Sequence, residues 1–109
     1  MKTLFIDDNT EWIGSMKKIF SDKDSVVFAE CHNVEEALHV VEVYQPEVIF
    51  LDHQLTEGGN EGFEIINKIS EIKIYSTTAN REIAQEYQKR GIEVVKKNDL
   101  QRFTQILSQ

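Results

Sequence analysis

The 109-residue sequence predicts a doubly wound α/β sandwich built on a five-stranded parallel sheet. Short apolar runs typical of strands alternate with longer amphipathic patterns typical of helices along the whole chain. The run at residues 48–51 is apolar at every position, as a strand buried on both faces requires. No repeat or linker-like segment interrupts the alternation, so we expect one domain over residues 1–109.

The expected strands are rich in β-branched and aromatic residues. They cover residues 4–6, 26–29, 48–51, 72–76 and 92–95. Each is followed by a helical pattern, so βαβ crossovers and a parallel sheet follow.

The expected helices begin at polar residues that can accept a hydrogen bond from the first turn. These are Asn9 or Thr10, Asn33, Asn80 and Asp99. Gly91 is expected to end the fourth helix. The residues expected on the apolar helix faces are Trp12, Ile13, Met16, Ile19, Phe20, Ala37, Leu38, Val41, Tyr44, Phe63, Ile66, Ile69, Ile83, Ala84, Tyr87, Leu100, Phe103, Ile106 and Leu107.

Composition excludes several classes of protein. The net charge is -7, and residues 1–54 hold 11 acidic against 4 basic residues, which argues against non-specific nucleic-acid binding. The single cysteine, Cys31, excludes an intramolecular disulfide framework and a cysteine-based zinc site. No apolar run approaches the roughly 20 residues that a membrane span needs. We therefore expect a soluble cytoplasmic protein.

Polar residues follow four of the expected strands. Asp7 and Asp8 end the first strand, Asp52 ends the third, residues 76–78 (Ser-Thr-Thr) end the fourth, and Lys96 and Lys97 follow the fifth. The carboxyl ends of parallel strands meet at one edge of the sheet, where such folds place their ligand sites. These carboxylates, hydroxyls and ammonium groups are therefore expected to converge.

This combination of groups fits metal-assisted phosphoryl transfer. Crowded carboxylates repel, whereas Mg²⁺ prefers oxygen ligands and is often held by one or two carboxylates together with a phosphate. A further carboxylate can act as the nucleophile toward the phosphoryl group, and a lysine and a hydroxyl can stabilise its oxygens. Any one aspartate after a strand could instead be only a helix cap or turn former. The convergence of all of them favours a site.

Four segments carry a family resemblance. They are Leu4–Asn9, Glu35–Leu38, Gln45–Asp52 and the glycine at position 62. In this order and spacing the sequence resembles the receiver domain of two-component response regulators over nearly its whole length. The resemblance implies a flavodoxin-like (βα)5 sandwich.

The resemblance also implies a phosphoacceptor and a metal site. Asp52 would receive a phosphoryl group from a histidine kinase or a histidine phosphotransfer protein. Asp8 and Asp52 would bind Mg²⁺ directly, joined by the backbone carbonyl of Gln54, and Asp7 would act through water.

Two further roles follow from the resemblance. Ser76 takes the position of the switch hydroxyl, because it lies fifteen residues before the glycine that ends the fourth helix. Thr77 is then the small residue that follows it, and Thr78 is the alternative for the hydroxyl. Lys97 takes the position of the phosphate-binding lysine, with Lys96 as the alternative.

The sequence departs from the family pattern in places. Thr56 replaces the usual proline, and the loop at residues 53–61 is about two residues longer. Val94 or Val95 stands where the family has an aromatic switch residue, which puts the standard coupling to the output face in doubt. His53 is expected to point away from Asp52, because side chains alternate along a strand.

We therefore expect a phosphorylation-controlled switch that changes its affinity for a protein partner, and not an enzyme acting on a separate substrate. The partner would bind the face of the fourth helix, fifth strand and fifth helix; homodimerisation stays open, and neither direct nucleic-acid binding nor membrane binding is expected. A phosphorylation-independent interaction module is one alternative. A small Mg²⁺-dependent phosphohydrolase is another, disfavoured because the chain lacks a cap segment and an Asp-x-Asp pattern.

Overall fold

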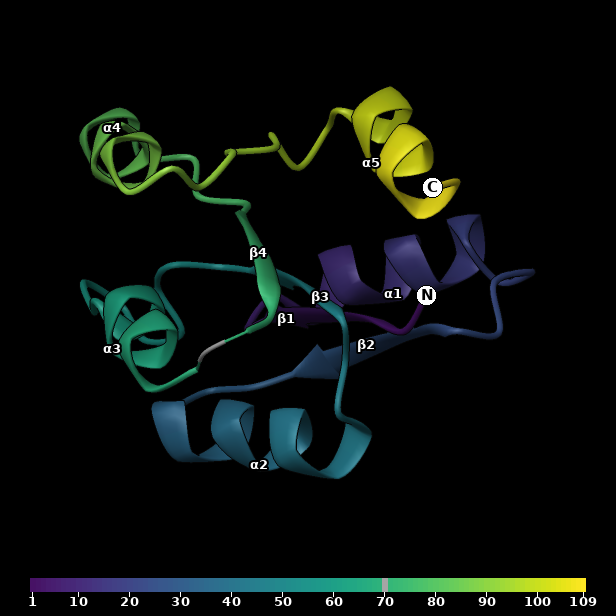
Figure 1. The fold of residues 1–109 in the computed structure, drawn as a ribbon, viewed down its shortest axis with the longest axis horizontal. Coiled ribbons are helices and arrows are strands. Elements are labelled where there is room, and N and C mark those ends of the chain that lie inside the picture. The colour runs from purple at the N-terminus through teal and green to yellow at the C-terminus, as the bar shows by residue number, and fades with distance from the viewer. Residues whose placement is uncertain (70) are drawn as a thin grey trace.

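The chain folds around a parallel β-sheet, seen edge-on in Figure 1, in a computed structural model that describes residues 1–69 and 71–109. The strands are β1 (Thr3–Asp7), β2 (Val26–Glu30), β3 (Val48–Leu51) and β4 (Lys73–Ser76). Their order across the sheet is β2-β1-β3-β4, and every neighbouring pair is parallel. This order places β1 and β3 side by side in the middle of the sheet.

Helices cover both faces of the sheet. They are α1 (Thr10–Ile19), α2 (Val34–Tyr44), α3 (Glu61–Lys68), α4 (Arg81–Lys89) and α5 (Leu100–Leu107). In Figure 1, α1 and α5 lie on one side of the sheet and α2 and α3 on the other, with α4 beyond β4. The predicted α/β fold class is confirmed. Among the described helices, none has the length and apolar character needed to cross a membrane.

The fifth strand is much shorter than predicted. Within residues 92–95 only Val94 forms a β-bridge, with Ser76 of β4. Two backbone hydrogen bonds hold this segment to β4: the Ser76 N–H donates to the Glu93 carbonyl (3.0 Å), and the Val95 N–H donates to the Ser76 carbonyl (2.8 Å). The chain then turns, with the Asp99 N–H bonded to the Lys96 carbonyl. The described residues therefore form four regular strands, and the fifth is reduced to one bridge.

The predicted helix caps are confirmed. The side chains of Asn9, Asn33, Asn80 and Asp99 each accept a hydrogen bond from a backbone N–H in the first turn of the helix that follows. Such caps satisfy donors that have no partner inside the helix. Gly91 follows α4 with φ of +78°, a left-handed conformation that glycine adopts without strain.

The two faces of the sheet carry separate hydrophobic cores. On the side of α1 and α5, Phe5 stacks on Phe50 and Phe50 stacks on Tyr75, and Phe103 of α5 packs against both phenylalanines. The core on the side of α2 and α3 contains Leu4, Ile6, Cys31, Ala37, Ile49, Leu51, Leu55 and Ile65. Strand residues thus alternate between the cores, and this alternation fixes the face of each residue near the strand ends.

The helix faces differ in detail from the predicted ones. Ile19 and Leu100 were expected in the core, but they are 48% and 40% exposed because they lie at helix ends. In α3 the fully buried apolar side chain is Ile65, whereas Phe63 and Ile66 flank it half-buried. Ile69 follows the helix in an extended conformation, so it does not extend the helical face.

Replacing Phe103 should test the first core. Phe103→Ala removes a fully buried ring that contacts Phe5, Trp12 and Phe50, and should lower the free energy of unfolding by about 3–5 kcal/mol in urea denaturation. Leu100→Ala in the same helix removes a partly exposed side chain and should cost less than about 1 kcal/mol. Equal losses in the two variants would contradict this packing.

Candidate functional site

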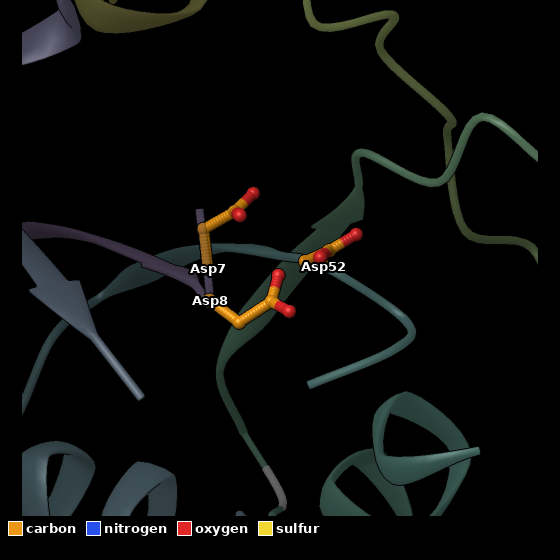
Figure 2. Close-up of side chains that lie close together, drawn as sticks. All are labelled: Asp7, Asp8 and Asp52. Carbon is orange, nitrogen blue, oxygen red and sulfur yellow. The ribbon is translucent and has the colours of Figure 1, made fainter. Parts of the chain in front are cut away.

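Three carboxylates meet at the carboxyl ends of β1 and β3. Asp7 is the last residue of β1, Asp8 follows it, and Asp52 follows β3. Each can offer an oxygen that lies within 4.8 Å of the other two, and Figure 2 shows the three side chains gathered beyond the strand ends. Asp7 is fully buried, Asp52 is 9% exposed and Asp8 is half-buried. The structure thus brings together the three aspartates that the sequence predicted to converge.

Lys97 supplies the positive charge beside this cluster. Its Nζ lies 2.8 Å from Asp7 Oδ2 and 3.7 Å from Asp52 Oδ2. Trp12 of α1 holds the same lysine, because its indole N–H donates to the Lys97 carbonyl (3.3 Å) and its ring lies 5.1 Å from Nζ. Lys96 is exposed and forms no ion pair within residues 1–69 and 71–109. Of the two candidate lysines, the fold brings Lys97 to the carboxylates.

Burial and mutual repulsion make the charged forms of two carboxyls unfavourable. Burial and the neighbouring charge of Asp7 raise the pKa of Asp52 to about 7, against the opposing effect of Lys97. Burial also raises the pKa of Asp7, although Lys97 and the Asn9 N–H stabilise its charged form. The positive charge of Lys97 therefore does not offset the negative charges of the three aspartates.

A pocket of about 330 Å³ opens beside the cluster. Its lining consists of Asp8, Asp52, Gln54, Thr56, Glu57, Thr78, Ala79, Asn80 and Lys97. The carboxylate of Glu61 fixes the loop on one side of this pocket by accepting bonds from the Leu55 N–H (2.7 Å) and the Thr56 N–H (3.1 Å). The pocket therefore gives outside groups access to Asp52.

The three hydroxyl residues after β4 occupy different environments. Ser76 pairs with Leu51, so it lies on the face opposite to Asp52, and its Oγ accepts a bond from the Thr78 N–H (3.3 Å). Thr77 continues this ladder through its N–H to the Leu51 carbonyl (3.0 Å), which places it opposite Asp52 and on the same face. The Thr77 hydroxyl is buried without a hydrogen-bond partner among the described residues. The Thr78 Oγ accepts a bond from the Asn80 N–H.

The sequence interpretation placed Thr77 as the small residue after the switch hydroxyl, for which it named Ser76, with Thr78 as the alternative. The spacing to Gly91 selected Ser76, but spacing along the chain does not report which face a residue occupies. Side-chain alternation along the strands places Thr77 once the cores are known. Tyr75 and Phe50 belong to the same core. Thr77 lies two residues after Tyr75 and Asp52 lies two residues after Phe50, so both lie on the same face of the sheet.

The oxygen-only donor set fits a hard divalent cation. Three carboxylates that can approach one point from two strands match the ligands that Mg²⁺ takes. The raised pKa values of Asp7 and Asp52 show that the unliganded cluster is short of positive charge. The open pocket leaves room for water molecules on the remaining positions. The structure thus provides an acidic pocket that can hold such an ion.

The comparison with protein families decides the family. The model for the response regulator receiver domain matches residues 3–108. The chain belongs to the response regulator receiver family. Receiver domains are signalling modules that respond to phosphorylation and are not conventional enzymes. They interact in general with histidine kinases or phosphotransfer proteins and with downstream targets.

Solved structures share the receiver fold with this chain. The N-terminal domain of an uncharacterized protein from Wolinella succinogenes superposes with a TM-score of 0.71 at 16% identity, over 99% of this chain and 94% of that chain. The N-terminal domain of a response regulator/sensory box/GGDEF 3-domain protein from Carboxydothermus hydrogenoformans gives 0.67 at 23% identity, over 99% and 90%. No curated protein sequence matches the chain.

The raised carboxyl pKa values of this receiver domain predict a pH-dependent stability. With folded pKa values above those of the unfolded chain, the folded state binds more protons, so the free energy of unfolding should fall as pH rises from about 4 to 7. Asp52→Asn removes one of the repelling charges. It should raise the free energy of unfolding at pH 7.5 without Mg²⁺ by on the order of 2 kcal/mol, and it should flatten the pH dependence in urea titrations.

The control is Asp24→Asn, which changes an exposed aspartate far from the cluster and should leave the profile unchanged. A lower unfolding free energy for Asp52→Asn than for the wild type would contradict the electrostatic interpretation.

Proposed function

We propose that the chain is a phosphorylation-controlled switch in which Asp52 accepts a phosphoryl group from a histidine kinase or a histidine phosphotransfer protein. The observation that carries this proposal is the position of Asp52: its carboxylate lies with Asp7 and Asp8 within 4.8 Å, 3.7 Å from the Lys97 ammonium, beside an open pocket. Membership of the receiver family supports it.

In the proposed reaction, an oxygen of the ionised Asp52 carboxylate attacks the phosphorus of the donor phosphohistidine. A P–O bond forms, the P–N bond breaks, and the released imidazole takes up a proton. Lys97 stabilises negative charge on the phosphoryl oxygens. Attack of water on the acyl phosphate later returns inorganic phosphate and the free carboxylate. The chain therefore acts only on its own side chain.

The metal ligands in this proposal are Asp8, Asp52 and the backbone carbonyl of Gln54, with Asp7 acting through water. A bound Mg²⁺ would neutralise part of the acidic cluster and offset charge on the phosphoryl oxygens. Asp7 keeps its ion pair with Lys97 and so holds that ammonium close to Asp52.

We assign the hydroxyl that contacts the phosphoryl group to Thr77, in place of the predicted Ser76. Thr77 lies on the face of Asp52 and its hydroxyl is buried without a partner in the described part of the chain, so a phosphoryl oxygen would supply one. Ser76 lies on the opposite face of the strand, and the hydroxyl of Thr78 already accepts a bond at the start of α4.

The proposed output is a change in affinity for a protein partner in the cytoplasm, through α4, residues 92–97 and α5. A groove of about 630 Å³ runs between α4 and residues 94–98, and Arg81, Lys96 and Lys97 line part of it. These cations suit an acidic segment of a target, and a homodimer through this face is the alternative. Residues 1–109 act as a single receiver-like domain in this proposal.

Acetyl phosphate with Mg²⁺ tests the phosphoacceptor. The wild type should gain one phosphate by intact-protein mass spectrometry, and Asp52→Ala should gain none, because among the described residues only Asp52 both pairs with Lys97 and lines the open pocket. Asp24→Ala, which removes an exposed aspartate, should be labelled like the wild type. Equal labelling of Asp52→Ala and the wild type would refute the assignment.

Three alanine variants distinguish the hydroxyls. Thr77→Ala should slow phosphorylation by acetyl phosphate by about tenfold or more, since it removes one hydrogen bond to a charged group. Ser76→Ala and Thr78→Ala should stay within about threefold of the wild type. Mg²⁺ binding, followed by the fluorescence of Trp12 beside Lys97, should be retained in all three. A larger loss in Ser76→Ala than in Thr77→Ala would restore the original assignment.

A further inference from the structure

The residue after the phosphoacceptor has an unusual setting. His53 is 1% exposed, and both of its ring nitrogens have partners. Nδ1 lies 2.7 Å from the hydroxyl of Tyr87 in α4, and Nε2 lies 3.0 Å from Oδ1 of Asn60 at the start of α3. As expected from the alternation, the ring points away from Asp52, and it enters the space between α3 and α4.

The partners define the direction of these hydrogen bonds. The carbonyl oxygen of Asn60 can only accept, so Nε2 of a neutral imidazole carries the hydrogen and donates to it. Nδ1 is then an acceptor, and the Tyr87 hydroxyl donates to it. Tyr87 is fully buried, and burial raises the pKa of its hydroxyl, so this donor stays protonated.

Gly62 leaves the space that this contact needs. A Cβ at Gly62 would overlap the Tyr87 hydroxyl and lie 2.8 Å from Nδ1 of His53. The Gly62 N–H also donates to the His53 carbonyl (2.8 Å), which ties the start of α3 to the same residue. Phe63 completes the cluster by stacking on Tyr87, with ring centroids 4.8 Å apart, and it meets the His53 ring edge-on.

The backbone of His53 reaches the proposed phosphoacceptor. Its N–H donates to Asp52 Oδ1 (3.1 Å). The next residue in the chain is Gln54, whose backbone carbonyl is a proposed metal ligand. A change in the bonding of Asp52 therefore acts directly on the backbone of His53, whose ring is held by Tyr87. At the other end of this chain of contacts, Tyr87 is the single buried side chain of α4, all of whose residues are described.

We propose that the Tyr87–His53 hydrogen bond couples the position of α4 to the bonding state of Asp52. This inference rests on the proposed function, which supplies the change at Asp52. His53 is a positioning residue in this scheme, because it contacts the Asp52 carboxylate through its backbone and takes no part in the transfer. Since α4 has one buried side chain, a shift of His53 moves or releases the main anchor of that helix.

Hydrogen exchange of the α4 amides tests the coupling, with Mg²⁺ and beryllofluoride as the phosphoryl mimic. In the wild type, the mimic should change exchange in residues 81–89. Tyr87→Phe removes only the hydroxyl, so these amides should exchange about five- to tenfold faster without the mimic, and their response to it should be lost. Beryllofluoride affinity, followed by Trp12 fluorescence, should stay within about threefold of the wild type.

Tyr75→Phe is the matched control. Tyr75 is also buried, but its hydroxyl has no hydrogen bond among the described residues, so this variant should respond like the wild type. An α4 response in Tyr87→Phe equal to that of the wild type would overturn the coupling. A wild type that binds beryllofluoride nowhere would instead refute the proposed function, so the two failures are distinguishable.

A double-variant comparison without any mimic gives a second readout. If His53 and Tyr87 stabilise the fold as one pair, His53→Phe with Tyr87→Phe should lower the urea midpoint no further than the worse single variant. Strictly additive losses would show that the two side chains act independently, which would overturn the proposal.

Discussion

The repulsion among Asp7, Asp8 and Asp52 is the constraint on which the rest of the site depends. Asp7 ends β1 and Asp52 follows the neighbouring strand β3, and the register of the two strands is fixed by Phe5 opposite Phe50. The two carboxylates therefore cannot separate unless the strands slip. A slip by one residue would exchange the two hydrophobic cores, at a cost far above the repulsion between two charges. The fold therefore holds an unfavourable charge arrangement that a bound proton or a cation relieves, and Lys97 relieves part of it.

The same register selects which groups share the site. Residues of the first core and the site residues that follow them keep one parity along each strand: Phe5 and Asp7, Phe50 and Asp52, Tyr75 and Thr77, Val95 and Lys97. The alternation that packs these residues into the core under α1 and α5 thus also places the polar groups on the same face of the sheet. The Thr77 hydroxyl, buried without a hydrogen-bond partner among the described residues, is one of these polar groups.

Much of this arrangement could be predicted from the sequence, because it depends on local patterns. The aspartates at strand ends and the capping residues Asn9 and Asn80 follow from short-range chemistry. The faces of the hydroxyl residues after β4 could not be predicted in this way, since they depend on the register between β3 and β4. The fifth strand was overestimated because apolar residues at 92–95 do not show that the chain turns at Lys96. The contact of His53 with Tyr87 joins residues 34 positions apart, which no local pattern reports.

The valines at positions 94 and 95 bear on the coupling proposed for Tyr87, the buried tyrosine of α4. Neither valine carries a hydroxyl that could respond to a change at Asp52, and Val95 is buried in the core on the α1 side of the sheet. Tyr87 approaches Asp52 from the other side of the sheet, through His53, the residue that follows Asp52. Tyr87 is the one buried side chain of α4, so its hydrogen bond links that helix directly to His53. A weakly held helix tied to a crowded charge cluster is the kind of element that a small change in bonding can shift.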